Sequence, residues 1–456
     1  MSKYAVRGGG YYLPPGSEIA DEIKNAFKLE NPDYATAHSL RSKGKWVDIP
    51  DPYVYGCQEI PAGHAWASGL AIPRGIDMTK YDLAMVERET CQEAKEVRLR
   101  RNLVLRDYQK DAVTRLIKHR QGMVVAPCGA GKTSIGIGAI SAIPTKALIL
   151  VHTLDLAEQW ADRCKTHLGE EPIIIGGGSK GKPKRITIAL FQTLCTMRWE
   201  ERYEWARQFG LVIADECHHI SSRTFSDVMM TMPARYRLGL TATPERPDGL
   251  EDIFRWHLGE TLVEITIEDL IKRKLVMAPA IEWLPTEWSG PAEDVDWSKL
   301  IRLMTQSESR NQIILERITE LVNEGRQVLV LSDRVAHCEE IANQMREQSV
   351  NAEALVGKLS KTRRKDLLDR ANKGDIRVIA ATTLADEGLD LPALDTVILT
   401  TPTKAMGRVQ QRIGRVMRVH NGKRQPLVID LIDDPGALRG MARKRYRLYA
   451  KLGCIT

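Results

Sequence analysis

Short apolar runs that alternate with helix-like segments restrict this chain to a wound α/β fold. From residue 123 onward, the runs are bounded by Gly, Pro or polar turns. They cover residues 123–126, 147–151, 173–175, 186–191, 211–214 and 238–240. Runs of this size are typical of strands buried on both faces of a parallel sheet. A helical repeat of four residues lies between two of them, in Leu154–Leu168. The pattern predicts a βα-wound parallel sheet.

The same pattern restarts later and predicts a second α/β domain. Its apolar runs cover residues 327–332, 377–382, 396–400 and 426–431, with a helix-like stretch over 334–348. Pro279–Pro291 carries three prolines and indicates a linker or an edge hairpin. The first hundred residues show few runs and one expected helix, Tyr81–Arg100, so we expect a small accessory domain there. A chain of 456 residues suits about three domains. We predict boundaries at 1–100, 101–285 and 286–456.

Charge is unevenly distributed along the chain. The formal net charge is +7, but residues 405–456 hold twelve Lys or Arg against three Asp, a local balance of +9. This segment suits a phosphate-binding face, and a solvated basic helix explains it equally well. Eight cysteines without a CxxC spacing indicate reduced, intracellular use. The longest aliphatic runs are strand-sized, so we expect a cytoplasmic protein of a prokaryote or a virus-infected host cell, neither secreted nor in a membrane.

A glycine-rich turn follows the first run of the wound region. Residues 127–133 read PCGAGKT and lead into a helix-like stretch. Such a turn presents backbone N–H groups to a phosphate at a helix N-terminus, and Gly129 and Gly131 supply the turn. Lys132 would reach the β and γ phosphates, and the Thr133 hydroxyl would take Mg²⁺. The strict pattern has Gly where this chain has Ala126, and a chance GKT in a turn is the alternative.

Two acids follow the run 211–214. Asp215 and Glu216 therefore end a predicted strand, where open α/β sheets bind ligands. Asp215 would hold Mg²⁺ through water, and Glu216 would orient and deprotonate the attacking water. A solvated strand end is the alternative. The adjacent Cys217, His218 and His219 do not suggest a metal site, because consecutive side chains point in different directions.

At this point the chain resembles a known family. Residues 215–218 (DECH), 240–244 (LTATP) and 411–418 (QRIGRVMR) occur in the order of superfamily 2 helicase motifs, in a match over about residues 103–432. The details resemble the branch of xeroderma pigmentosum group B proteins, type III restriction translocases and phage branch-migration helicases. The resemblance implies two tandem RecA-like parallel-sheet domains plus a small N-terminal accessory domain. It also implies ATP, Mg²⁺ and a DNA partner.

The resemblance assigns further nucleotide contacts. Residues 105–109 are similar to the adenine-contacting motif, with Arg106 and Gln109 beside the base. Residues 332–334 and 386–390 resemble second-domain motifs, in which Gly388 and Asp390 would bridge the nucleotide and strand sites. Arg415 and Arg418, with Gln411, would act on the γ phosphate, where an inserted guanidinium is worth about 10³ to 10⁵ in rate. The alternative is a basic stripe of Arg412, Arg415 and Arg418 that only binds phosphates.

The resemblance also implies contacts to the nucleic acid. Uncharged side chains would bind its phosphate oxygens without reading sequence. They are Thr153, Gln192, Thr193, Thr382 and Thr383. A helix cap is an equally good explanation for Thr153. Residues that would couple the two sites are Thr241, Thr243 and His218. Where group B relatives have Arg-Glu-Asp, this chain has Arg246-Pro247-Asp248, so a strand-separating role for this element is not supported.

The sequence therefore predicts an ATP-dependent DNA helicase or translocase. The resemblance implies 3′ to 5′ movement on single-stranded, forked or junction DNA in repair or recombination. The alternatives are an RNA-dependent ATPase of the same fold, a double-strand translocase that does not unwind, and a scaffold protein whose nucleotide pocket is only a switch. The N-terminal aromatics could stack on bases, although burial in a small core is favoured. They include Tyr11, Tyr12, Trp46, Tyr53, Tyr55 and Trp66.

Overall fold

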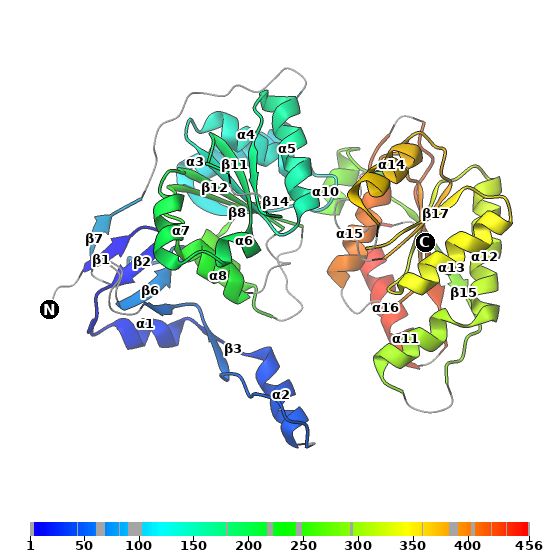
Figure 1. Cartoon of the computed structure of the whole chain (residues 1–456), viewed down its shortest axis with the longest axis horizontal. Coiled ribbons are helices and arrows are strands. Elements are labelled where there is room, and N and C mark those ends of the chain that lie inside the picture. The colour runs from blue at the N-terminus through cyan, green and yellow to red at the C-terminus, as the bar shows by residue number, and fades with distance from the viewer. Residues whose placement is uncertain are drawn as a thin grey trace. The chain divides into compact units, whose positions relative to one another are not determined.

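The computed structural model forms two compact units (Figure 1). The described residues are 4–42, 44–60, 69–81, 83–89, 103–178, 181–216, 222–242, 249–291, 295–357, 359–382, 391–402, 406–420, 422–434 and 436–454. One unit holds residues up to 126 and residues 131–264, and the other holds residues 127–130 and those from 265 onward.

In the described residues, the first unit is built on a seven-stranded parallel sheet in the order β10-β11-β9-β12-β13-β8-β14. The strands are β8 (Gln121–Val125), β9 (Ala147–Val151), β10 (Ile173–Ile175), β11 (Ile186–Leu190), β12 (Leu211–Asp215), β13 (Tyr236–Thr241) and β14 (Thr261–Glu264). The helices are α3 (Asp107–His119), α4 (Lys132–Ala142), α5 (Leu154–Leu168), α6 (Phe191–Cys195), α7 (Trp199–Ala206), α8 (Ser222–Met230) and α9 (Asp252–Leu258).

The local sequence accounts for these elements. Strand β9 is buried along its whole length, as expected for a strand in the middle of a covered parallel sheet. Helix α5 begins after Thr153, whose hydroxyl accepts a hydrogen bond from the Leu156 N–H at 3.3 Å. It ends before Gly169, whose φ of 75° is a left-handed conformation that glycine adopts without strain. The six predicted strands and this helix are confirmed. Strand β14 was not predicted, because this short edge strand buries little more than Leu262.

The N-terminal segment forms a mixed sheet in the order β5-β6-β2-β1-β7. Its strands are β1 (Tyr4–Arg7), β2 (Gly10–Leu13), β5 (Gln58–Ile60), β6 (Gly69–Pro73) and β7 (Ala84–Glu87). An excursion from this sheet comprises α1 (Ala20–Ala26), β3 (Lys28–Glu30), α2 (Pro32–Ser42) and β4 (Tyr53–Tyr55), with β3 and β4 paired (Figure 1). Tyr11 and Tyr12 are buried, whereas Trp46 is 89% exposed. The N-terminal aromatics thus divide between core and surface, and Trp66 lies outside the described residues.

The helix predicted over Tyr81–Arg100 is wrong in its first half. Residues 84–87 form β7, which pairs in parallel with β1. All four side chains of β7 are exposed, so its sequence carries no alternation and the pairing is set by tertiary structure. Residues 90–102 lie outside the described part of the chain, and the predicted boundary at residue 100 remains a prediction.

Buried arginines fasten the N-terminal sheet to the parallel sheet of the same unit. Arg74, just after β6, donates to the carbonyl oxygens of Ala234 at 2.6 Å and Arg235 at 2.8 Å. Arg237, in β13, donates to the carbonyl oxygens of Gly9 and His257. Both guanidinium groups are fully buried, and a buried charge needs such partners. The N-terminal sheet and the parallel sheet therefore pack as one body.

The second unit has a six-stranded parallel sheet in the order β15-β20-β19-β16-β18-β17. The strands are β15 (Ala280–Pro285), β16 (Val328–Leu331), β17 (Ala352–Leu355), β18 (Val378–Ala381), β19 (Thr396–Leu399) and β20 (Leu427–Ile432). The helices are α10 (Ile267–Lys272), α11 (Trp297–Thr305), α12 (Glu308–Asn323), α13 (Val335–Glu347), α14 (Lys361–Asn372), α15 (Met406–Val416) and α16 (Gly436–Lys451). The four strands and the helix predicted here are confirmed.

The segment Pro279–Pro291 is not a linker or a hairpin over its first half. Residues 280–285 form β15, an edge strand that pairs in parallel with β20 from Ala280 opposite Leu427 to Pro285 opposite Ile432. Proline is tolerated at the end of an edge strand. The prolines of this segment therefore did not exclude a strand, although they suggested a linker or a hairpin. Among the helices of the described residues, none is long and apolar enough to cross a membrane.

Candidate active site

Three neighbouring strands of the first unit end at one edge of its sheet. In the order β12-β13-β8, Asp215 lies opposite Leu240, and Thr241 lies opposite Val125. The Ala126 N–H donates to the Thr241 carbonyl oxygen at 2.9 Å, and the Glu216 N–H donates to the Leu240 carbonyl oxygen at 2.9 Å. Both bonds continue the ladders past the strand ends. Carboxyl ends of parallel strands are where open α/β sheets bind ligands.

The glycine-rich turn opens α4, as the sequence predicts. Gly129 and Gly131 have φ angles of 88° and 77°. The left-handed backbone at Gly131 favours glycine there, and a Cβ would also stand 2.6 Å from the Gln109 Nε2 atom, which would have to move. Lys132 is the first residue of α4, and its ammonium donates to the Ala126 carbonyl oxygen at 3.0 Å. Thr133 follows in the first helical turn, where backbone N–H groups and the helix dipole favour an anion.

Lys132 also meets one of the acids. Its Nζ lies 3.2 Å from the Glu216 Oε1, and both side chains are largely buried. Glu216 has a φ of 46°, a left-handed conformation that is uncommon for a residue other than glycine. Such backbone strain persists where the surroundings enforce it, often at functional sites. The strand end therefore directs this carboxylate at the lysine of the glycine-rich turn.

Asp215 is the most enclosed group of the site. Only 3% of its surface is exposed, and its Oδ2 accepts a hydrogen bond from the Trp160 Nε1 at 2.7 Å. Burial, which is the largest cause, and the charge of Glu216 together raise the pKa of Asp215 to about 6, against the opposing effects of Lys132, the Trp160 hydrogen bond and His152. Its Oδ1 is buried and has no hydrogen-bond partner among the described residues.

This donor set fits magnesium. Mg²⁺ prefers oxygen ligands and keeps several of its waters, and the Asp215 Oδ1 is a buried carboxylate oxygen suited to hold such a water. The Thr133 hydroxyl belongs to the same glycine-loop helix that begins at Lys132. A bound Mg²⁺ would neutralise charge on the phosphate oxygens. Asp215 and Thr133 are the residues that would hold it.

The predicted adenine-contacting residues lie beside the glycine-rich turn. Gln109 is buried; its Oε1 accepts from the Arg106 N–H at 2.9 Å, and its Nε2 donates to the Gly131 carbonyl oxygen at 3.4 Å. Arg106 donates from Nη1 to the Tyr108 hydroxyl at 3.0 Å. These bonds join the start of α3 to the turn before α4. Their contact with a base remains a prediction.

The arginines of the second unit lie on and just after α15. Arg412 and Arg415 are buried in the helix, and the Arg412 Nη2 lies 3.4 Å from the Asp333 Oδ1. Arg418 follows the helix end, where its backbone forms a β-bridge with Val276 and its carbonyl oxygen accepts from the Lys423 Nζ at 2.9 Å. Arg412 thus serves as an ion-pair partner, which does not fit an exposed stripe. The side chain of Gln411 lies outside the description.

The predicted nucleic-acid contacts follow the carboxyl ends of β9, β11 and β18. Thr153 is a helix cap, as the alternative prediction had it. Gln192 is exposed and Thr193 half-buried on α6, and Thr382 is half-buried after β18. Their contact with a strand remains a prediction. Several predicted residues lie outside the described part of the chain: His218, Thr243, Thr383, Gly388, Asp390 and the element Arg246–Asp248.

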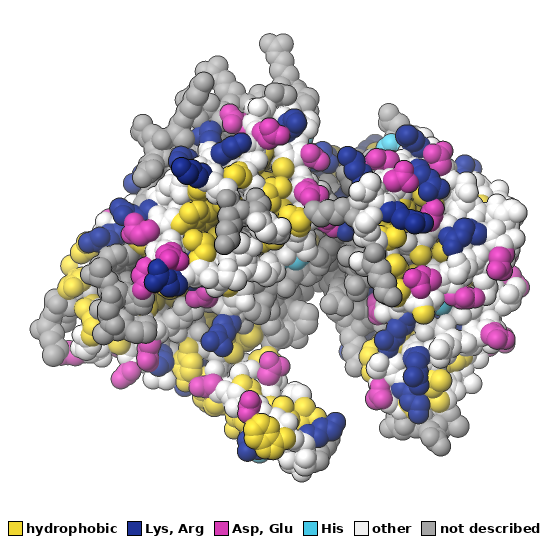
Figure 2. Space-filling view, viewed as in Figure 1, with side chains coloured by type: hydrophobic (Ala, Val, Ile, Leu, Met, Phe, Trp, Pro, Cys, Tyr) yellow, Lys and Arg dark blue, Asp and Glu magenta, His cyan; other side chains and the backbone are white. Residues whose placement is uncertain are grey.

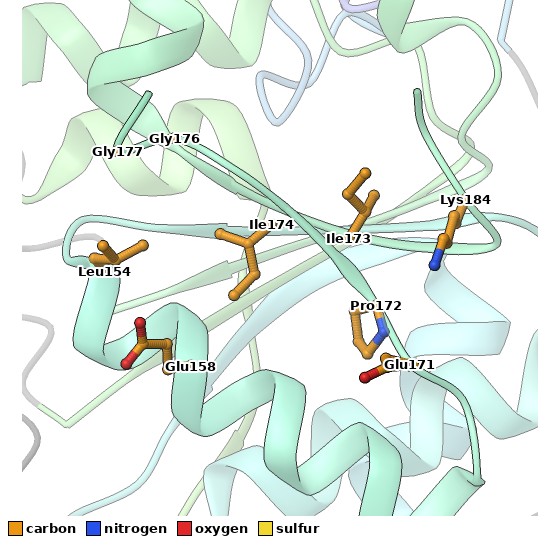
Figure 3. A pocket seen from close by; sticks show the side chains of 9 residues that line it. All are labelled: Leu154, Glu158, Glu171, Pro172, Ile173, Ile174, Gly176, Gly177 and Lys184. Carbon is orange, nitrogen blue, oxygen red and sulfur yellow. The ribbon is translucent and has the colours of Figure 1, made fainter. Parts of the chain in front are cut away.

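A separate hollow of about 460 Å³ lies at the β10 edge of the same sheet. Figure 3 shows Ile174 of β10 pointing towards Leu154 and Glu158 of α5. Glu171, also in its lining, pairs with Lys165 at 3.7 Å. Its lining mixes apolar side chains with Glu158, Glu171 and Lys184 and contains no residue of the predicted nucleotide site.

Sequence reasoning missed one residue of the site. Trp160 was identified only as part of the apolar repeat of the helix 154–168, yet its indole N–H reaches Asp215. The two residues are 55 positions apart, and no local pattern joins them. A tryptophan at a repeat position is usually core, so only the fold reveals its polar contact.

Comparison with known proteins agrees with this geometry. The family model described as type III restriction enzyme, res subunit, matches residues 102–246, and the helicase conserved C-terminal domain matches residues 310–420. The DNA 3'-5' translocase XPB2 of Sulfurisphaera tokodaii is 27% identical over 381 residues, 75% of this chain and 84% of that protein. A protein of Acanthamoeba polyphaga mimivirus, provisionally named ATP-dependent RNA helicase L396, is 26% identical over 361 residues, 76% of this chain and 68% of its own.

A solved structure shares the fold. Helicase Lhr of Mycobacterium smegmatis, bound to ssDNA and AMP-PNP, superposes with a TM-score of 0.56 at 19% identity, over 75% of this chain and 48% of that one. Two parallel-sheet units with these two modules, in this order, define a superfamily 2 helicase, an enzyme that hydrolyses ATP with Mg²⁺. Within the superfamily, the chain is similar to type III restriction subunits and to XPB-like proteins.

Proposed function

We propose that this chain is an ATP-driven DNA helicase or translocase that moves 3′ to 5′ and acts on forked or junction DNA in repair or recombination. The observation that carries the proposal is the set of Lys132, Asp215 and Glu216 at one sheet edge. The translocase of Sulfurisphaera tokodaii, named for DNA and for this direction, supports the substrate and the polarity. Cys57, Cys164 and Cys338 are free thiols, which supports an intracellular role.

The first unit would supply the acid–base chemistry. Lys132 binds the β and γ phosphates, and Glu216 accepts a proton from the attacking water, which is typically worth about 10² to 10⁴ in rate. Glu216 is suited to this role because its carboxylate lies within 3.2 Å of Lys132, and so close to the phosphates that Lys132 would bind. Asp215, whose Oδ1 has no hydrogen-bond partner among the described residues, would hold Mg²⁺ through a water.

The second unit would supply charge stabilisation. Arg415 and Arg418, with Gln411, act on the phosphoryl group as charge develops on it. Gly388 and Asp390 connect the nucleotide with the strand, and Thr241, Thr243 and His218 transmit the change. Alternating grip by Thr153, Gln192, Thr193, Thr382 and Thr383 then moves the protein along a strand. A domain boundary near residue 100 is part of this proposal; the main part of the second unit itself begins at residue 265.

The lysine variant tests the proposal. We expect Lys132→Ala to abolish DNA-stimulated ATP turnover while DNA binding stays measurable by fluorescence anisotropy. Lys118→Ala, an exposed lysine of α3 in the same unit, is the matched control and keeps wild-type turnover. Turnover that survives in Lys132→Ala contradicts the central assignment. A scaffold whose pocket is only a switch would show no polynucleotide-stimulated turnover even as wild type.

Two alternative functions retain ATP-driven movement along a nucleic acid. An RNA substrate is favoured by the mimivirus relative, which is named for RNA; stronger stimulation by single-stranded RNA than by DNA of the same length would support it. A double-strand translocase that does not unwind is favoured by the relative named a translocase. It would displace a third strand from a triplex but leave a forked duplex intact. Fork, flap and junction substrates compared with the full chain then identify the preferred DNA.

Figure 2 bears on how DNA would be held. On the face shown, Lys and Arg side chains are interspersed with Asp and Glu over each unit. Alternating charges do not form the continuous basic stripe that dominates non-specific binding. The predicted grip by hydroxyl and amide groups at the strand ends does not require such a stripe on this face.

A further inference from the structure

A fully buried tryptophan touches the metal-binding acid of the site. Trp160 lies on α5, and none of its surface is exposed. Its indole carries a single donor and no acceptor. This N–H donates a hydrogen bond to the Asp215 Oδ2 at 2.7 Å. The contact links α5 to the carboxyl end of β12, both in the first unit (Figure 1).

A glycine in the neighbouring helix makes room for this ring. Gly136 lies in the interior of α4, and a Cβ there would stand 2.4 Å from the Trp160 ring. Glycine inside a helix is roughly 0.5 to 1 kcal/mol less favourable than alanine. Here it lets α4, which begins at Lys132, approach the indole closely. The ring is therefore held between the glycine-loop helix and the strand that carries Asp215.

The hydrogen bond has a consequence for the carboxylate. With Oδ2 bound to the indole, rotation of the Asp215 carboxylate is restricted. Its Oδ1 is buried and has no hydrogen-bond partner among the described residues. A buried carboxylate oxygen without a partner is costly, so this atom is available to a polar ligand. Of the two oxygens of this carboxylate, Oδ2 accepts the indole hydrogen bond and Oδ1 is left for a ligand.

We propose that Trp160 is a positioning residue for the Mg²⁺ site, and that its indole N–H fixes Asp215 so that Oδ1 can bind a metal-bound water. The proposal deepens the proposed function, since it rests on the assignment of Asp215 to Mg²⁺. Partners that orient a ligand in this way are often worth about 10- to 100-fold in metal affinity. A tryptophan that only filled the core would make no such difference.

Replacement of the ring tests the role of the N–H. Trp160→Phe keeps an aromatic ring and removes the donor. We expect the Mg²⁺ concentration for half-maximal binding of a fluorescent ADP analogue to rise about 10-fold or more. Turnover should recover in part at high Mg²⁺, while the KM for ATP at saturating Mg²⁺ stays near wild type. The matched control is Trp205→Phe, a partly buried tryptophan of the same unit, which should leave the Mg²⁺ requirement unchanged.

A second variant covers the case in which Trp160→Phe does not fold. Gly136→Ala would place a Cβ 2.4 Å from the Trp160 ring, so the ring must shift relative to Asp215, and the Mg²⁺ requirement should rise in the same direction. An unchanged Mg²⁺ requirement in the folded variant, or an equal rise in Trp205→Phe, overturns the inference. Asp215→Asn distinguishes failure of the proposed role of Asp215 from failure of the inference about Trp160. If it leaves the requirement unchanged, the proposed role of Asp215 fails and the inference falls with it; if it raises the requirement and Trp160→Phe does not, only the inference fails.

Discussion

The two parallel sheets share an architecture but carry different chemistry at their carboxyl ends. In the first unit, a lysine and two acids meet at the edge formed by β12, β13 and β8. In the second unit, the candidate residues are arginines on and after α15, which follows β19, with Asp333 as a partner of Arg412. An arginine cannot give up its proton in a protein. Under the proposed function, the first unit would activate water and the arginines of the second unit would stabilise charge.

The largest expected effect tests the second unit. Arg415→Ala should lower kcat for ATP by about 10³- to 10⁵-fold, because the guanidinium acts on charge that develops in the transition state. The affinity for a fluorescent ATP analogue should stay near wild type, since the interaction is absent in the ground state. Steady-state turnover and equilibrium binding measure the two effects. Arg439→Ala, an exposed arginine of α16, is the control. An affinity loss as large as the rate loss would show that Arg415 is an ordinary phosphate ligand.

The next effect tests the first unit. Glu216→Gln keeps the size and removes the base, so we expect the single-turnover rate to fall by about 10² to 10⁴ while nucleotide binding is retained. Glu204→Gln, on the exposed face of α7, should turn over as wild type. If Glu216→Gln instead abolishes nucleotide binding, the Lys132–Glu216 contact holds the glycine-rich turn, and another group must serve as the base.

Most strands of the two parallel sheets could be predicted from the sequence, for a physical reason. Strands in the middle of a covered parallel sheet must be apolar throughout, so β9 could be placed from its composition alone. Edge strands escape that requirement: β7 exposes every side chain and β15 ends in proline, and both were mispredicted. At the site, Lys132 and Glu216 lie in motifs with fixed spacing. The Trp160 contact depends on how α5 packs on the sheet, which no spacing records.

A third prediction concerns stability and tests a buried ion pair of the second unit. Arg310 of α12 is fully buried and binds both carboxylate oxygens of Asp433, at 2.7 and 3.1 Å, and the Thr400 carbonyl oxygen at 2.6 Å. Arg310→Met leaves that carboxylate buried without its cation, so we expect a loss of about 3 to 5 kcal/mol in the free energy of unfolding of the second unit. Urea denaturation followed by limited proteolysis can assign the transition to this unit.

The exposed pair Arg198–Glu201 of the first unit provides the control for this prediction. Arg198→Met should change the free energy of unfolding by less than about 1 kcal/mol, because solvent screens a surface pair and side-chain entropy opposes it. If the two variants lose the same stability, burial does not increase the contribution of the Arg310–Asp433 pair.

The smallest expected effect separates two roles of one residue at the β9 end. Thr153→Ala removes the cap of α5 and should lower the free energy of unfolding of the first unit by about 1 kcal/mol. Thr153→Asn keeps a capping oxygen and should keep that stability. Anisotropy with single-stranded DNA then isolates the predicted strand contact, because in the Asn variant the cap is intact. Unchanged DNA affinity in Thr153→Asn would assign the hydroxyl to the helix alone. A lower affinity at unchanged stability, alike for all DNA sequences, would assign it to the phosphate backbone as well.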